Sequence, residues 1–442
     1  MRCLFFFVLI FYSEIAKTEN LPTSGTLLWR ISGNGLSENS YLYGTMHSRD
    51  KRAFRFGDSV ISCLMRCKTM AMELKLDELN REEMVSNMMM DSGQTIKNYL
   101  TKNQYDSIEQ KIKTATGLPL SLFERIKPIY IATMIAQNEM LYDSANRDSN
   151  SFFLDEYFEW VAKHAGKNVY ALEELQTQLD IFNFFSTEQQ IAMLMKSICE
   201  ANDKSSATTF INEYINGELE ILLTNENNEV WPIEFMNKIL YERNSCITNK
   251  IELLIKNKST FSAFGAAHLT GDLGVISLLR KKGFTVEPVE ASYDNITEEG
   301  WLYVYPYSVI SVSMPGIPVF LNDTLLSSKI IYQKWTSTQS NNYVVAHFDK
   351  SVSMNKLLLE KFASTEINSS LILQSVKNKF TAKRNIKTYA FSRKLTNGNA
   401  FIIENGNEKI AVLVYKDSLI DTEELKRFLS LIRYKISSVI PN

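Results

Sequence analysis

The chain has few histidines and almost no net charge. Four of its 442 residues are histidine, and 48 basic residues against 50 acidic ones leave a formal charge of −2 at pH 7. The Lys and Arg residues are scattered among Asp and Glu, so the sequence has no basic stripe of the kind that binds a phosphate backbone. We therefore expect no nucleic-acid partner.

The sequence also lacks an uninterrupted hydrophobic run long enough to cross a bilayer. Residues 3–12 are apolar but too few to span one. Residues 301–321 contain three prolines and a glycine, which favours strands and turns over a membrane helix. The amino-terminal run instead indicates a secretory signal peptide at 1–16. We therefore expect an exported protein, periplasmic or extracellular, with no stable membrane anchor once this peptide is removed.

Cysteine is too sparse for a disulfide scaffold, and a chain of this length can bury a core without disulfides. Cys63 and Cys67 stand four residues apart, where a helix places both on one face. That spacing suits a metal pair, but two small apolar residues on the buried side of the helix is the simpler interpretation. The cysteines beyond the signal peptide are Cys63, Cys67, Cys199 and Cys246.

Two of the four histidines follow the same short pattern, an apolar run that closes on Gly-x-x-His. The first cassette is Tyr41-Leu-Tyr-Gly-Thr-Met-His47, and the second is Phe261-Ser-Ala-Phe-Gly-Ala-Ala-His268. The glycine lets the backbone turn sharply or pass close to a ligand, and the imidazole follows directly. This arrangement is typical of active-site loops. The two copies lie so far apart in the sequence that they can meet only in the fold.

The elements around the two cassettes are predicted to repeat in one order: strand, Gly-x-x-His, helix, strand. Two β-α-β units in one sheet put both cassettes at the carboxyl ends of their strands, the edge where open α/β sheets bind ligands. We therefore expect His47 and His268 to face one crevice. The predicted strands are 27–31, 41–43, 69–74, 261–264 and 285–289, and the predicted helices include 58–68 and 234–256.

Glu73 is the third residue that we place in this crevice. It ends the strand after the first unit's helix, so a parallel sheet brings its carboxylate to the same edge as both imidazoles. Two histidines and a carboxylate can hold a divalent ion and leave positions open for water and substrate. They can also act without metal, with the glutamate orienting a histidine that serves as general base. The spacing does not separate these two alternatives.

The rest of the chain divides into two parts of different composition. Between about 79 and 225 the apolar residues mostly recur at three and four, which predicts a helical insertion interrupted by a short strand at 168–172. Residues 298–442 are rich in aromatic, β-branched and turn residues, which predicts an antiparallel α+β accessory domain with helices at 353–364 and 421–433. This domain shows no catalytic cluster, so we expect a binding or positioning role.

An ordered set of short motifs resembles the TraB/GumN family, to which the Tiki metalloproteases belong. Gly-x-x-His alone is a weak signal, but the ordered set is specific and covers about residues 25–290, within a predicted α/β domain at 25–292. It consists of Leu27-Leu-Trp-Arg-Ile31, the first cassette, Ala71-Met-Glu-Leu74, Arg125-Ile-Lys-Pro128, Ala171-Leu-Glu173 with Gln178, Glu242-Arg-Asn244, and the second cassette followed by Gly271 and Gly274.

The resemblance implies an α/β domain with a mostly parallel sheet and a helical insertion, similar to erythromycin esterases and haem-binding ChaN-like proteins. It implies a divalent-metal-dependent peptidase in which His47, Glu73 and His268 are catalytic and hold Mn, Co or Zn, with a peptide or protein as substrate. Arg243, from the Arg-Asn pair, is implied to stabilise a developing oxyanion, with a helix-surface salt bridge as the alternative.

Two further classes stay open beside the metallopeptidase: a metal-independent esterase-like hydrolase, and a non-catalytic binder of peptide, metal or haem. The C-terminal residues faintly resemble PsbP-like domains. That likeness rests on a strand before Met314-Pro-Gly-Ile-Pro318 and a closing helix with Phe428-Leu-Ser-Leu431.

Overall fold

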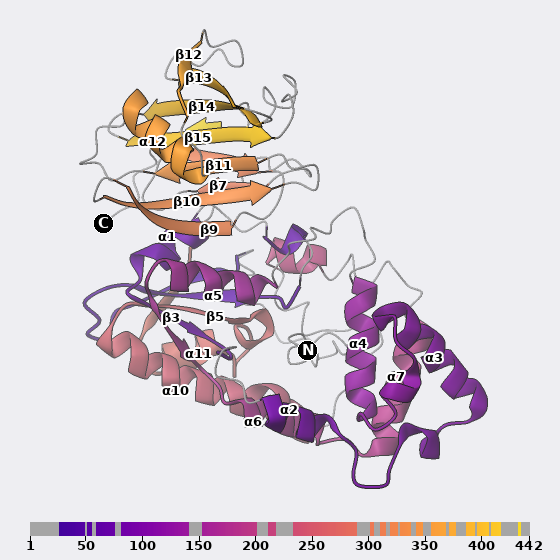
Figure 1. Cartoon of the computed structure of the whole chain (residues 1–442). Coiled ribbons are helices and arrows are strands. Elements are labelled where there is room, and N and C mark those ends of the chain that lie inside the picture. Colours follow the sequence, from indigo (N-terminus) through magenta and orange to yellow (C-terminus); the bar gives the residue numbers. More distant parts are fainter. Residues whose placement is uncertain are drawn as a thin grey trace.

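The computed structural model has an α/β sheet with flanking helices, a helical lobe beside it and a C-terminal antiparallel sheet (Figure 1). The signal peptide predicted at 1–16 lies outside the described residues. The structure describes residues 26–48, 51–54, 59–75, 81–140, 153–200, 211–217, 233–289, 301–304, 310–314, 319–325, 328–336, 342–347, 355–367, 371–376, 386–393, 396–405, 408–416 and 432–434.

The α/β sheet has six strands in the order β4-β3-β5-β2-β1-β6. The pairs β4·β3, β3·β5 and β5·β2 are parallel, whereas β1 runs antiparallel to both of its neighbours. The predicted mostly parallel sheet is thus confirmed, with β1 as the exception. Its strands are β1 Leu28–Ser32, β2 Ser40–Thr45, β3 Thr69–Met72, β4 Asn168–Ala171, β5 Thr260–Gly265 and β6 Thr285–Pro288.

Both predicted β-α-β units are present. The first is β2, helix α1 (Ser59–Arg66) and β3, and the second is β5, helix α11 (Val275–Lys281) and β6. Strands β2 and β5 are buried along most of their length, as expected of central strands covered on both faces. They pair in parallel up to Thr45 opposite Gly265. The two cassettes therefore run side by side along these strands and end at the same edge of the sheet.

Helix α1 buries one face against this core, and Cys63 and Cys67 belong to that buried region as free thiols. No group of His, Cys, Asp and Glu in the described part of the chain could hold a metal there. Both thiols lie in the apolar core, which is the position that the interpretation as small apolar residues predicts.

The region predicted as a helical insertion is largely helical. Thr101 caps one of its helices by accepting from Gln104 N, and Gly117 ends that helix with φ of 74°. The chain also returns to the sheet within this region, because α5 packs against β3 and β4. Its helices are α2 Arg81–Met88, α3 Lys102–Thr116, α4 Pro128–Met140, α5 Leu154–His164, α6 Leu175–Phe182 and α7 Thr187–Glu200.

The lobe at the side of the sheet is formed by α3, α4 and α7, which surround an apolar cluster of their own that includes Ile108, Ile131 and Leu194 (Figure 1). A continuous helical stretch then leads back to the sheet, as predicted for 234–256. It consists of α9 (Ile233–Met236), a π-helical segment η8 (Asn237–Tyr241) and α10 (Glu242–Asn257). None of the described helices is long and apolar enough to cross a bilayer.

The C-terminal part is the predicted antiparallel α+β unit. Its larger sheet has the order β12-β13-β14-β15-β11-β10-β9, and its smaller sheet the order β16-β8-β7. The helix predicted at 353–364 is present as α12 (Lys356–Glu366). The strands are β7 Trp301–Val304, β8 Ile310–Met314, β9 Val319–Leu325, β10 Ser328–Thr336, β11 Asn342–His347, β12 Gln374–Ser375, β13 Ile386–Arg393, β14 Thr396–Asn405, β15 Glu408–Lys416 and β16 Ile432–Tyr434.

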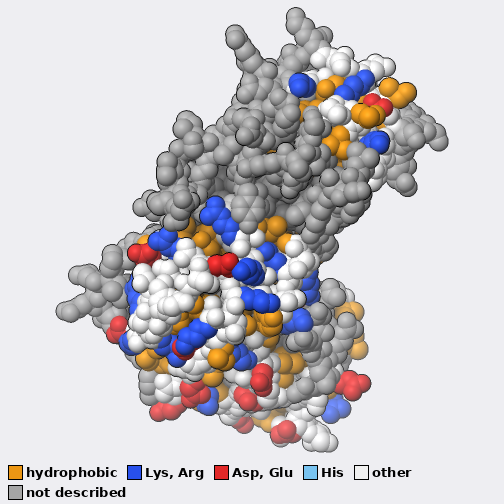
Figure 2. Space-filling view, turned by 90° about the vertical axis from the view of Figure 1, so that its left-hand side faces the viewer, with side chains coloured by type: hydrophobic (Ala, Val, Ile, Leu, Met, Phe, Trp, Pro, Cys, Tyr) orange, Lys and Arg blue, Asp and Glu red, His pale blue; other side chains and the backbone are white. Residues whose placement is uncertain are grey.

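The two faces of the larger sheet pack differently. Phe362 of α12 belongs to the cluster that covers one face, together with Val344, whereas Val345 and Val412 belong to the same apolar core as the α/β sheet. The helix predicted at 421–433 lies outside the described residues up to position 431, and Ile432 and Arg433 are in strand β16. Figure 2 shows one face of the molecule, on which Lys and Arg side chains lie scattered among acidic and hydrophobic ones.

Candidate functional site

Polar side chains follow four neighbouring strands of the α/β sheet where each strand ends. Glu173 comes shortly after β4, Glu73 directly after β3, His268 after β5 and His47 after β2, and these strands are adjacent in that order. The carboxyl ends of parallel strands share one edge, which is where open α/β sheets bind ligands. The structure thus brings the residues predicted from sequence to one edge of the sheet.

The two cassettes touch each other at Gly44. A Cβ atom at this position would lie 2.7 Å from Leu269 Cδ1 and 3.0 Å from both Cα and Cβ of Ala266. Glycine is favoured here because any side chain would crowd Ala266 of the second cassette and displace the end of the Leu269 side chain. Tyr214 also donates a hydrogen bond to the Gly44 carbonyl at 2.9 Å. The first cassette is therefore held directly against the second.

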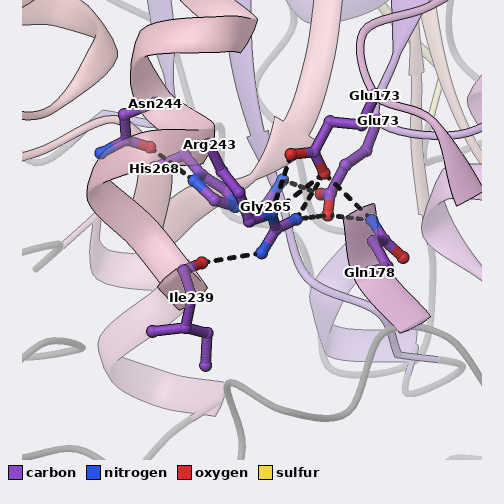
Figure 3. A network of polar contacts seen from close by, with 8 residues as sticks. All are labelled: Glu73, Glu173, Gln178, Ile239, Arg243, Asn244, Gly265 and His268. Atoms are coloured by element: carbon purple, nitrogen blue, oxygen red, sulfur yellow. Dashed lines mark hydrogen bonds and ion pairs between the residues drawn. The ribbon is translucent and has the colours of Figure 1, made fainter. Parts of the chain in front are cut away.

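Glu73 is the centre of a buried polar network (Figure 3). Its side chain is almost wholly buried, at 5% exposure. Oε1 accepts from Gln178 Nε2 at 2.7 Å and from Arg243 Nη2, and Oε2 accepts from the Gly265 backbone N–H at 3.2 Å. The carboxylate is thus bonded to the first residue of the second Gly-x-x-His motif.

Arg243 joins Glu73 to Glu173. Its Nε donates to both Glu173 oxygens at 2.8 and 3.1 Å, and its Nη2 donates to Glu173 Oε2 at 2.6 Å and also to Glu73. Its Nη1 donates at 2.9 Å to the carbonyl of Ile239, which lies in the π-helical segment η8. The side chain is 4% exposed, so the surface salt bridge considered from the sequence is wrong. The oxyanion role stays a prediction.

Glu173 accepts more hydrogen bonds from Arg243 than Glu73 does, and the pKa values of the two carboxyls therefore shift in opposite directions. Burial is the main reason that the pKa of Glu73 is raised to about 7; the charge of Arg243 opposes this rise, and the charges of Glu173 and Asp155 add to it. Burial also opposes ionisation of Glu173, but the charge and several hydrogen bonds of Arg243 outweigh it and lower the pKa of that carboxyl. Glu73 is therefore the carboxyl that exchanges a proton near neutral pH.

His268 is fully buried, and its tautomer follows from its neighbours. Its Nδ1 lies 2.6 Å from Asn244 Oδ1, and Asn244 Nδ2 donates to the Leu273 carbonyl at 2.8 Å. A carbonyl can only accept, so the amide oxygen of Asn244 must face the imidazole. Nδ1 of His268 therefore carries the proton, and Nε2 keeps its lone pair.

The Nε2 atom of His268 is buried and has no hydrogen-bond partner among the residues that the structure describes. Burial, and then the charge of Arg243, lower the pKa of His268 to about 3. The imidazole is therefore neutral at physiological pH and presents a buried lone pair, which suits a hydrogen-bonded water, a substrate N–H or a metal ion.

His47 is held by the start of helix α5. Its Nδ1 lies 3.1 Å from Asp155 Oδ2, and its ring stacks on Phe153 with centroids 3.9 Å apart. A carboxylate accepts, so Nδ1 of His47 carries a proton and Nε2 is the other ring nitrogen. Because the Asp155 charge contributes to the raised pKa of Glu73, this pair lies within electrostatic reach of the network.

Several residues of the site were not predicted as functional. Glu173 follows β4 as Glu73 follows β3, so the strand pattern contained a signal for it, and Asn244 is adjacent to Arg243 in the sequence. Gln178 bonds both carboxylates from α6, at 2.7 Å to Glu73 and 3.1 Å to Glu173. Asp155 had no signal, because its pairing with His47 depends on how α5 returns to the sheet.

The predicted metal ligands do not form a ligand set in this geometry. No group of three His, Cys, Asp or Glu side chains within the described ranges could hold a metal ion. Glu73 is instead bonded to a guanidinium, whose positive charge opposes a second cation at the same carboxylate. Nε2 of His268 has the buried lone pair that a ligand needs. As a set of three, His47, Glu73 and His268 do not fit a divalent ion in this arrangement.

Comparisons with known proteins point to one family. The family model described as TraB/PrgY/gumN matches residues 27–288. The chain is 21% identical to a protein of Danio rerio named metalloprotease TIKI2, over 64% of this chain and 68% of that protein. It is 22% identical to the metalloprotease TIKI homolog of Amphimedon queenslandica, over 67% of each chain.

A third relative, metalloprotease TIKI1 of Homo sapiens, is 21% identical over 62% of this chain and 65% of that protein. No solved structure matches the chain. The family match ends before the C-terminal sheets, so the PsbP-like resemblance has no support from these comparisons. The likeness to erythromycin esterases and ChaN-like proteins stays a prediction.

Proposed function

The chain belongs to the TraB/PrgY/gumN family, and from this premise we propose that it is a hydrolase that cleaves peptide or protein substrates. The relatives' names support the reaction class. The observation that carries the proposal is a buried acid–base set at one sheet edge, in which Glu73 has a pKa of about 7 and His268 a pKa of about 3. Such separated values at one site are typical of acid–base catalysis.

Amide hydrolysis needs a base for the attacking water and an acid for the leaving nitrogen. A general base is most effective when its pKa lies near the working pH. The pKa of Glu73 is about 7 and that of His268 about 3, so Glu73 is the better base near neutral pH. Glu73 therefore takes the proton of the water, and Nε2 of His268 accepts a hydrogen bond that orients it. Glu73 then passes this proton to the leaving nitrogen and returns to its carboxylate form, while His47, held by Asp155 in the manner of a catalytic His–Asp pair, orients the substrate amide.

A divalent-metal-dependent peptidase is the second candidate. The name metalloprotease of the relatives favours it, as does the buried lone pair on Nε2 of His268. Its ligands would be His47, Glu73 and His268, with Mn, Co or Zn as the ion. The arrangement described above does not fit that set of three, so the steps proposed here pass through no metal.

A hydrolysis assay separates these candidates. Protein purified without chelator is incubated with a fluorogenic peptide library, with and without EDTA, and its metal content is measured by mass spectrometry. We expect turnover that survives EDTA and is lost in Glu73→Gln, while His347→Ala in strand β11 serves as the control. Turnover undiminished in Glu73→Gln contradicts the proposal. Stoichiometric metal that disappears in His47→Ala and His268→Ala, with activity lost in EDTA, favours the metallopeptidase.

We further propose that the protein is exported, periplasmic or extracellular, through its amino-terminal apolar run. The relatives' names suggest protein substrates but do not address export. Residues 25–292 would form the catalytic unit and 298–442 an accessory unit that binds or positions the substrate. Amino-terminal sequencing of protein recovered from the medium or periplasm tests this, and a mature chain that still begins at Met1 contradicts it.

A further inference from the structure

The buried network contains more acid than base. Glu73 and Glu173 are each 5% exposed and Arg243 is 4% exposed. An ionised carboxylate in such a place is costly unless a positive group lies beside it and its oxygens are hydrogen-bonded. The site therefore needs a cation, and the identity of that cation decides what Glu73 is free to bind.

The guanidinium of Arg243 is fixed on three sides. Glu173 takes a two-pronged contact from Nε and Nη2, Glu73 takes a further contact from Nη2, and the Ile239 carbonyl takes Nη1. The planar fork of arginine matches carboxylate geometry, which a lysine or a spherical ion does not reproduce. The π-helical segment supplies the third contact, and such segments occur often at functional sites.

The remaining lone pairs of Glu73 are also largely used. Oε1 accepts from Gln178 and Arg243, and Oε2 accepts from the Gly265 backbone N–H. An ion bound to Oε1 would share that atom with the guanidinium, where two positive charges in a low-dielectric interior repel strongly. The donor set around Glu73 thus resembles that of a carboxylate held for proton exchange.

We propose that Arg243 is the resident cation of this site, and that Glu73 is bonded to its guanidinium and does not ligate a metal ion. Arg243 is then a positioning residue that orients Glu73 toward the edge of the sheet. This inference deepens the proposed hydrolase function. It rests on that function only in treating the network as part of a catalytic site. Its tests measure binding and stability, so they succeed or fail independently of any hydrolysis.

The first test is chemical replacement of the side chain. Arg243→Ala leaves both carboxylates facing an empty space of guanidinium shape, and guanidinium chloride at millimolar concentration is the probe. We expect a lowered melting midpoint that rises by about 2 °C when guanidinium is at about ten times its Kd. The matched control is Arg30→Ala, which removes an exposed Arg–Glu pair with side chains 43% and 50% exposed. Guanidinium should raise the melting midpoint of neither this control nor the wild type.

The second test does not depend on the folding of Arg243→Ala. Wild type and Glu73→Gln are titrated with Mn²⁺ by calorimetry, and we expect the two to give the same isotherm within error. Mn²⁺ affinity that falls tenfold or more in Glu73→Gln overturns the inference. A folded Arg243→Ala whose midpoint does not respond to guanidinium overturns it as well.

Discussion

Glu73 and His268 change their proton affinity in opposite directions when the protein folds, and stability as a function of pH tests this. Burial raises the pKa of Glu73 from 4.5 to about 7 and lowers that of His268 from 6.5 to about 3. Folded Glu73 keeps a proton that the unfolded chain releases, so its stabilisation is full below pH 4.5 and is lost as pH rises through 7. The stabilisation from neutral His268 is full above pH 6.5 and is lost as pH falls through 3.

The two contributions nearly cancel in the wild type. Each changes the free energy of unfolding by about 1.4 kcal/mol per pH unit, or about 3 kcal/mol across the two units between pH 4.5 and 6.5 where both titrate. Glu73→Gln removes the contribution that falls with pH, so the variant should gain about 3 kcal/mol relative to wild type as pH rises through this interval. His268→Asn should lose a similar amount relative to wild type over the same interval.

Urea denaturation of wild type and both variants at several pH values in this interval provides the assay. The difference in free energy of unfolding between wild type and variant removes the contributions of all other titrating groups. Differences of opposite slope for the two variants are expected. If both differences are independent of pH, the buried and oppositely shifted pair does not exist and the proposed base loses its support.

Two further variants test how the histidines are held. Asn244→Leu removes the acceptor of His268 Nδ1, so we expect a loss of about 1–3 kcal/mol in denaturation and a shift of the His268 proton to Nε2 in ¹⁵N NMR of ring-labelled protein; an unchanged tautomer would refute the assignment. Asp155→Asn keeps an acceptor but removes the charge beside His47, so we expect kcat/KM to fall about 10–100-fold with stability nearly unchanged. Full activity in this variant would show that Asp155 does not position His47.

Much of the fold could be predicted because local and global signals agree. Strands β2 and β5 read as continuous apolar runs ending at glycine, and each is followed by a helix and another strand. The handedness and adjacency rules for such units then place both cassettes at one edge. The contact of Gly44 with Ala266 could not be predicted, because it depends on the register between two strands far apart in sequence.

The site was predictable in its position but not in its bonding. Glu73 and His268 are at the edge where their strands predicted them, whereas Arg243 was expected either at the surface or at an oxyanion. The Arg243 side chain points inward and bonds the Ile239 carbonyl of a π-helical segment. The spacing of apolar residues in the sequence does not predict such a segment. The pairing of His47 with Asp155 likewise joins residues 108 positions apart through the return of α5 to the sheet. Such contacts arise from tertiary packing and have no local sequence signature.

The central claim is that the two Gly-x-x-His cassettes pack against each other, so that their histidines belong to one site. A double-mutant cycle at Gly44 and Leu269 measures this contact, since a Cβ on Gly44 would lie 2.7 Å from Leu269 Cδ1. Gly44→Ala should cost about 1–3 kcal/mol and Leu269→Ala about 2–5 kcal/mol. The double variant should cost less than their sum by at least about 0.5 kcal/mol, because the shortened side chain makes room for the new methyl group. Costs that add within about 0.3 kcal/mol would contradict the shared site.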